Sequence, residues 1–106
     1  MTPWPKYSSE EIQAVSNVLK SGKVNYLYGN IGKEFEKEFA NFVGTNYALA
    51  LANGTLALDI ALRAIGISHG DEVIVTPRSY IASVSSVSLL GGNPKFVDID
   101  FNSQNI

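Results

Sequence analysis

Several residue types are scarce or absent in this sequence of 106 residues, and each absence excludes a class of protein. There is no cysteine, which excludes disulfide bonds, cysteine-based zinc sites and thiol catalysis. A single histidine, His69, cannot form a metal cluster, so we expect no metal site. Eight basic residues against ten acidic ones provide no basic stripe, so nucleic acid is not an expected partner. No apolar run approaches the roughly 20 residues that span a bilayer, and no membrane association is expected.

The composition is that of a packed domain, with 45% hydrophobic and 17% charged residues. The length allows one small domain at most, because domains typically need roughly 100–150 residues. The N-terminal segment lacks the basic and apolar regions of a secretory signal. We therefore expect a cytoplasmic protein.

Two amphipathic helices are predicted in the first half of the chain. Ser8 and Glu11 have the spacing of a capping box, which predicts a helix over residues 9–21. A second helix, ending at Gly44, is predicted from apolar residues at helical intervals, namely Phe35, Phe39, Phe42 and Val43. The segment 21–32 between them is rich in glycine, asparagine and tyrosine, and we interpret it as an irregular connection with a functional role.

Strands and helices are predicted to alternate from residue 47 onward. Short apolar runs predict strands at 47–52, at 73–75 and from 95 to about 99. Helical stripes between them end at Gly66 and at the glycine pair 91–92. This alternation favours a three-layer α/β/α fold with a mainly parallel sheet. Three strands make a thin sheet, so we expect the chain to be the front part of a larger domain.

The turn from the first predicted strand into its helix is the strongest candidate site. The N-terminus of a helix attracts anions through unpaired N–H groups and the helix dipole, so a phosphate could bind there. Gly54 would let the ligand approach the backbone closely, and Thr55 would add a hydroxyl donor. The alternative interpretation is that Asn53 or Thr55 only caps the helix.

A second candidate site lies at the carboxyl end of the strand 73–75, the edge where ligands bind in open α/β sheets. Tyr80 could offer its flat face to a planar ring, or could simply pack against neighbouring residues. Asp98 and Asp100 could pair as a carboxylate couple or begin a turn. His69 is expected to lie exposed in a turn.

The motifs in combination are more specific than any one of them. They are, in order, Phe35-Glu36 with Phe39-Ala40, Gly44, Asn53-Gly54-Thr55-Leu56-Ala57-Leu58, Gly70-Asp71-Glu72-Val73-Ile74-Val75, Pro77 with Tyr80-Ile81-Ala82, Gly91-Gly92 and Phe96-Val97-Asp98-Ile99-Asp100. This series resembles the N-terminal third of the DegT-type sugar aminotransferases, and the resemblance covers nearly the whole chain. Those enzymes use pyridoxal 5′-phosphate on the fold-type I aminotransferase scaffold.

The resemblance implies that Gly54 and Thr55 hold the cofactor phosphate and that Tyr80 stacks on the pyridine ring. It also implies that the full-length enzyme is a homodimer that transfers an amino group from glutamate to a nucleotide-linked keto sugar, in amino-sugar or cell-surface polysaccharide biosynthesis. The connection 23–30 matches a segment that approaches the sugar in relatives. Residues 1–106 would be a single incomplete domain, with helices and a loop over 1–45 and a βαβαβ segment over 46–106.

The catalytic lysine and the acid that pairs with the ring nitrogen follow the third strand in this family, and we expect neither within this chain. The chain should therefore be inactive alone. An alternative from another class is a noncatalytic module of the same fold that binds a phosphate ligand or acts as a sensor. Other fold-type I enzymes, such as desulfurases or amino-acid aminotransferases, are a further alternative.

Overall fold

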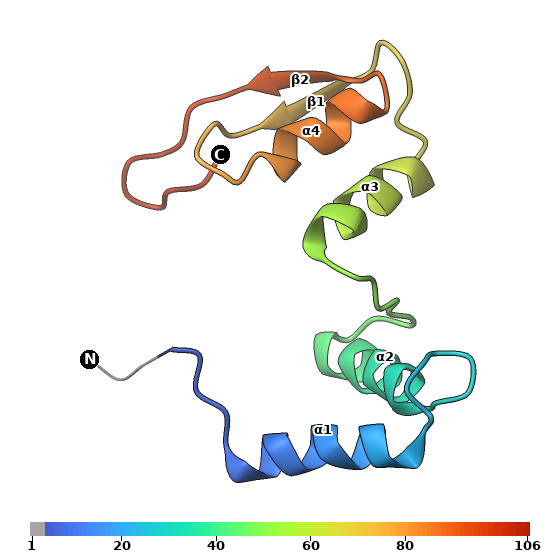
Figure 1. The fold of residues 1–106 in the computed structure, drawn as a ribbon. Coiled ribbons are helices and arrows are strands. Elements are labelled where there is room, and N and C mark those ends of the chain that lie inside the picture. Colours follow the sequence, from blue (N-terminus) through green and yellow to red (C-terminus); the bar gives the residue numbers. More distant parts are fainter. Residues whose placement is uncertain (1–3) are drawn as a thin grey trace. The chain divides into compact units, whose positions relative to one another are not determined.

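The computed structural model describes residues 4–106, in which two compact units are distinguished (Figure 1). The N-terminal unit extends to Ala50, and the C-terminal unit comprises Leu51–Ile106. Each unit has its own elements and its own contacts.

The N-terminal unit contains helices α1 (Ser9–Ser21) and α2 (Ile31–Val43). The predicted capping box is confirmed: the Glu11 N–H donates to Ser8 Oγ at 3.2 Å, and the Ser8 N–H donates back to Glu11 Oε2 at 2.6 Å. Helix α2 ends at Gly44, whose backbone is left-handed with φ of 75°. Such a conformation is accessible to glycine without a steric penalty, which explains why the helix stops there.

The C-terminal unit contains α3 (Gly54–Ala64), β1 (Glu72–Val75), α4 (Ala82–Leu89) and β2 (Asn93–Phe96). Strands β1 and β2 pair in parallel, with Glu72 opposite Asn93 and Val75 opposite Phe96. Helix α4 connects them and packs against both strands and against α3. Parallel strands joined by a helix confirm the predicted α/β alternation in this region.

The prediction of a strand over residues 47–52 is wrong. This segment forms no ladder, and the sheet in the described part of the chain has two strands instead of the expected three. A parallel strand needs a neighbour to accept and donate its backbone hydrogen bonds, and residues 4–106 place no strand beside this segment. The Ala50 N–H instead donates to the carboxylate of Glu36 at 2.8 Å.

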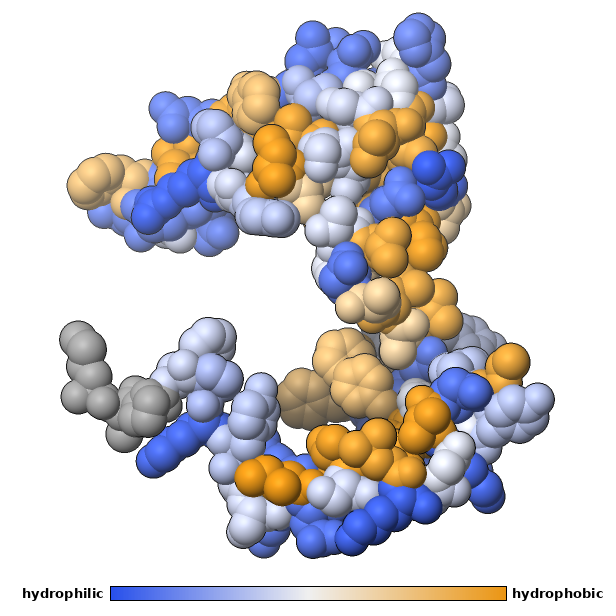
Figure 2. All heavy atoms as spheres, viewed as in Figure 1, coloured by the Kyte–Doolittle hydropathy of each residue, from blue (hydrophilic) through white to orange (hydrophobic). Residues whose placement is uncertain are grey.

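The two units differ in how far their apolar side chains are buried. The C-terminal unit has a small core in which Val75, Ala82, Ser86 and Val87 are all less than a tenth exposed. In the N-terminal unit, Ala40, at 5% exposure, is the buried hydrophobic side chain among the described residues. Apolar side chains gather instead at the surface of its helices (Figure 2), with Val15 62% and Phe42 88% exposed. None of the helices described is both long and apolar enough to cross a membrane.

Candidate functional site

The first candidate site is the N-terminus of α3, where Asn53 precedes the first turn of the helix. The backbone of Asn53 is extended, and its side-chain oxygen accepts the N–H of Leu56 at 3.0 Å. Its carbonyl accepts the N–H of Ala57 at 3.1 Å. Asn53 is therefore the N-cap, as one of the two interpretations of this turn predicted, and its side chain satisfies one of the four N–H groups that a helix leaves free at its start, that of Leu56.

Two of the three remaining N–H groups belong to Gly54 and Thr55, the first residues of α3. No protein acceptor within residues 4–106 takes either of them, and both residues are exposed. A Cβ atom added at Gly54 would meet nothing within 4 Å, so the space beside this backbone is open. Free N–H groups, a threonine hydroxyl and open space at a helix N-terminus fit the phosphate of a cofactor.

Tyr80 lies between β1 and α4 in the same unit, and its side chain is 75% exposed. The N–H of Ser83 donates to its carbonyl at 3.0 Å, which holds the backbone just ahead of α4. Helices α3 and α4 pack together and run in the same direction in Figure 1, so Tyr80 and the α3 turn lie at corresponding helix ends. The exposed ring is available for stacking, and no hydrogen bond among the described residues joins it to Gly54 or Thr55.

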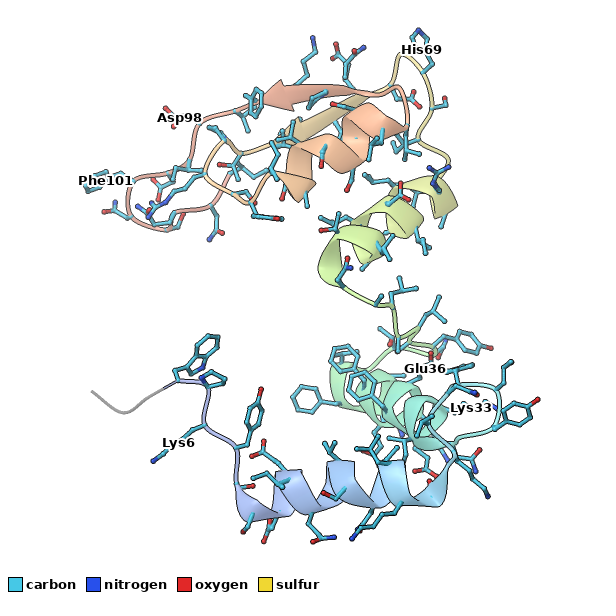
Figure 3. The ribbon with its side chains drawn as sticks, viewed as in Figure 1. Lys6, Lys33, Glu36, His69, Asp98 and Phe101 are labelled. Atoms are coloured by element: carbon cyan, nitrogen blue, oxygen red, sulfur yellow. The ribbon has the colours of Figure 1, made fainter. Side chains whose placement is uncertain are left out.

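The remaining polar candidates have structural roles. Asp100 accepts the N–H groups of Asn102 and Ser103 at 3.1 and 2.7 Å, so it begins a turn, and the Ser103 N–H lowers the pKa of its carboxyl group. Asp98 accepts the neighbouring Ile99 N–H at 2.9 Å. No cluster in the described residues could hold a metal ion. His69 is exposed in a turn, as predicted (Figure 3).

The lysines of this chain are all exposed: Lys6, Lys20, Lys23, Lys33, Lys37 and Lys95. Lys95 forms an ion pair with Glu72 on the neighbouring strand at 2.9 Å. Lys33 lies over the ring of Tyr26, 5.5 Å from its centroid. Both are exposed, so neither lies in a buried pocket of the kind expected for a Schiff-base lysine.

Sequence reasoning missed Glu36 as an individual residue. Its two carboxylate oxygens accept hydrogen bonds from separate segments, the Tyr26 hydroxyl at 2.9 Å and the Ala50 N–H at 2.8 Å. The hydrogen bond to this carboxylate raises the pKa of Tyr26. Glu36 lies three residues before Phe39 and seven before Val43, within the apolar stripe of α2, and a charged residue in such a stripe is the signal that could have identified it.

Comparison with known protein families decides the assignment. The model of the DegT/DnrJ/EryC1/StrS aminotransferase family matches residues 5–106. The chain belongs to this family.

Known aminotransferases and a known transaminase are similar to the chain in sequence or structure. The dTDP-3-amino-3,6-dideoxy-alpha-D-galactopyranose transaminase of Aneurinibacillus thermoaerophilus is 42% identical, over 95% of this chain and 27% of its own. The solved aminotransferase from Psychrobacter cryohalolentis is 54% identical, with a TM-score of 0.90, over 93% of this chain and 25% of its own. Spr1654 from Streptococcus pneumoniae, solved in its PLP-form, is 34% identical with a TM-score of 0.83, over 91% of this chain and 24% of its own.

These likenesses confirm the predicted fold class, an α/β fold that corresponds to the N-terminal part of the fold-type I aminotransferases. The family and the solved forms that contain pyridoxal phosphate indicate pyridoxal phosphate as the cofactor. The chain spans about a quarter of the length of the relatives it matches.

Proposed function

We propose that the chain is the N-terminal part of a pyridoxal-phosphate-dependent aminotransferase that transfers an amino group from glutamate to a nucleotide-linked keto sugar. Two observations support this proposal: the family match over residues 5–106, and the free N–H groups of Gly54 and Thr55 at the start of α3. A transaminase of a dTDP-linked sugar among the relatives favours a nucleotide sugar as the amino acceptor. The products would be the amino sugar and 2-oxoglutarate, so atoms balance without a further reactant.

In this proposal, residues 1–106 form one incomplete domain of a cytoplasmic homodimer, with helices and a loop over 1–45 and the phosphate-binding segment over 46–106. Pyridoxal phosphate supplies an electron sink for carbanion chemistry when bound. Gly54 and Thr55 bind its phosphate through N–H groups and a hydroxyl, and Asn53 fixes the turn that presents them. Tyr80 offers its exposed ring as a stacking face, which orients the cofactor.

The Schiff-base lysine and the acid that pairs with the ring nitrogen lie outside residues 1–106 in this proposal. The six exposed lysines of this chain support that inference, because a lysine in this role needs a lowered pKa and contact with the cofactor. The fragment alone would be inactive.

Titration of the full-length apoenzyme with pyridoxal 5′-phosphate, followed by fluorescence, tests the phosphate site. Thr55→Val removes one hydroxyl donor to a dianion, and hydrogen bonds to charged groups contribute roughly 1.5–3 kcal/mol, so affinity should fall about tenfold to a hundredfold. Thr45→Val is the matched control, since it loses a hydrogen bond from its hydroxyl to the Tyr47 carbonyl within the N-terminal unit. Its affinity for the cofactor should equal that of the parent.

Two results would contradict the proposal in different ways. Equal affinities for Thr55→Val and the parent would mean that the α3 turn is only a helix cap. Tight binding of a phosphate ligand by a parent that converts no keto sugar would favour the noncatalytic module instead.

A further inference from the structure

Side-chain hydroxyl groups hold the segment between β1 and α4, which carries Tyr80 (Figure 1). The hydroxyl oxygens of Ser79 and Ser83 lie 2.8 Å apart and share a hydrogen bond, and Tyr80 lies between these two residues in the chain. Closer to β1, the hydroxyl oxygen of Thr76 accepts the N–H of Arg78 at 3.1 Å. Hydrogen bonds from side chains therefore fix the backbone on both sides of Tyr80.

The backbone itself supplies little of this support. Residues 76–80 belong to neither a helix nor a strand. The N-cap of α4 is Ile81, whose apolar side chain cannot accept an N–H group of the first turn. The Ser83 N–H reaches back only to the Tyr80 carbonyl, at 3.0 Å. The bond between the hydroxyl groups of Ser79 and Ser83 therefore closes a turn that the helix N-terminus leaves without a side-chain cap.

The ring of Tyr80 depends on this turn for its position. It is 75% exposed, so packing within the C-terminal unit does not fix it. The rotamers open to a side chain depend on its backbone, so a fixed backbone limits where the ring can point. A ring that is placed before its ligand arrives loses less conformational freedom on binding, and the ligand binds more tightly.

We propose that Ser79 and Ser83 are positioning residues, which act through Tyr80 to hold its ring where it stacks on the pyridine ring of the cofactor. This inference rests on the proposed function, in which Tyr80 is the stacking residue. Neither serine touches the cofactor in this role. Loss of either hydroxyl group removes the same hydrogen bond, so the two single variants should behave alike.

The test titrates full-length apoenzyme with pyridoxal 5′-phosphate, followed by fluorescence, in the parent and in Ser79→Ala, Ser83→Ala and Tyr80→Ala. Ser79→Ala and Ser83→Ala should each weaken cofactor binding about twofold to fivefold, as expected for the loss of one hydrogen bond between neutral groups. Neither loss should exceed that of Tyr80→Ala, because the serines act only through this ring.

Two further variants serve as controls. Ser88→Ala should bind the cofactor as the parent does, because Ser88 is an exposed serine of the same helix whose hydroxyl donates to the Val84 carbonyl at 3.4 Å, away from Tyr80. Ser79→Thr should also keep the parental affinity, because it retains the hydroxyl group at an exposed position.

Two further readouts distinguish positioning from stability. The visible circular dichroism of the bound cofactor depends on how its ring is held, so it should change in Ser79→Ala and Ser83→Ala and stay parental in Ser88→Ala. In a Tyr80→Ala background, Ser83→Ala should cause no further loss of cofactor affinity, because the residue through which it acts is absent.

Parental affinity and dichroism in either Ser79→Ala or Ser83→Ala would overturn this inference alone, because both variants lack the same hydrogen bond. A loss in Ser83→Ala that adds in full to that of Tyr80→Ala would also overturn it, since the effect would then not pass through Tyr80. If Ser83→Ala does not fold, Ser79→Ala decides the question in both backgrounds. A full-length parent that binds no pyridoxal phosphate would overturn the proposed function, and with it this inference.

Discussion

Different interactions stabilise the N-terminal unit and the C-terminal unit internally. The C-terminal unit has a backbone ladder between β1 and β2 and a helix that buries Val87 and Ser86 to 1% exposure. The N-terminal unit depends on hydrogen bonds from side chains, such as the Ser8 and Glu11 box and the bonds to Glu36. Much of its apolar surface is exposed.

This difference matches the role proposed for the C-terminal unit. A phosphate site needs fixed N–H groups, and here they lie at the start of α3, which packs against α4.

The largest expected effect is on the core of the C-terminal unit. Val87→Ala removes two methyl groups at a position that is 1% exposed, which should cost about 2 kcal/mol of the free energy of unfolding. Phe42→Ala, at a position 88% exposed in the N-terminal unit, should change it by less than about 0.5 kcal/mol. Urea unfolding followed by circular dichroism measures both. An equal loss in Phe42→Ala would show that the apolar face of α2 is covered in solution, and the comparison between the units would then fail.

A smaller and more local effect is expected in the loop of the N-terminal unit. Gly29→Ala would place a Cβ atom 2.6 Å from one backbone oxygen and 2.9 Å from another, so the loop has to shift. Because the loop lies outside the core and can yield, the cost should be about 1 kcal/mol, at the low end for overpacking. Gly54→Ala, with open space around the new atom, should leave the stability unchanged. Hydrogen exchange of the Gly29 N–H and its neighbours locates the change. Parental exchange rates in Gly29→Ala would contradict the close approach of the Gly29 backbone to these two oxygens.

The sequence predicted the elements that depend on local signals. The capping box at Ser8 and the glycine stop at Gly44 are encoded within a few residues, and both are confirmed. The strand over 47–52 was mispredicted because its apolar pattern describes a buried environment, whereas a strand also needs a neighbour that residues 4–106 do not place there. A hydrophobic pattern indicates which face of a segment is apolar, but it does not identify the strand or helix that covers this face.

In the candidate site, too, the local features were predictable and the contacts between distant residues were not. The α3 turn follows from asparagine, glycine and threonine ahead of an apolar stripe, so Asn53 could be identified as a possible cap from local sequence. The bonds from Tyr26 and Ala50 to Glu36 span ten and fourteen residues and depend on how the loop folds back on α2. No local rule gives that geometry, although a carboxylate within an apolar stripe points to the residue.

The smallest expected effect is a response to pH, and it sharpens the comparison because it should spare the C-terminal core. The backbone N–H of Ser8 and its hydroxyl lower the pKa of Glu11 below its ordinary value of 4.5. A group whose pKa is lowered by folding stabilises the fold above its unfolded pKa, and that contribution is lost as the pH falls through the folded pKa. The first turn of α1 should therefore loosen below about pH 4.5. The β1 and β2 ladder should persist, because its backbone bonds do not titrate and the exposed Lys95–Glu72 ion pair across it contributes little to stability. Amide exchange measured from pH 6 down to about pH 3 follows both regions, and Glu11→Gln should remove the response in α1. If the ladder opened together with α1 over this range, the two units would behave as one cooperative structure, and the distinction between them would not hold.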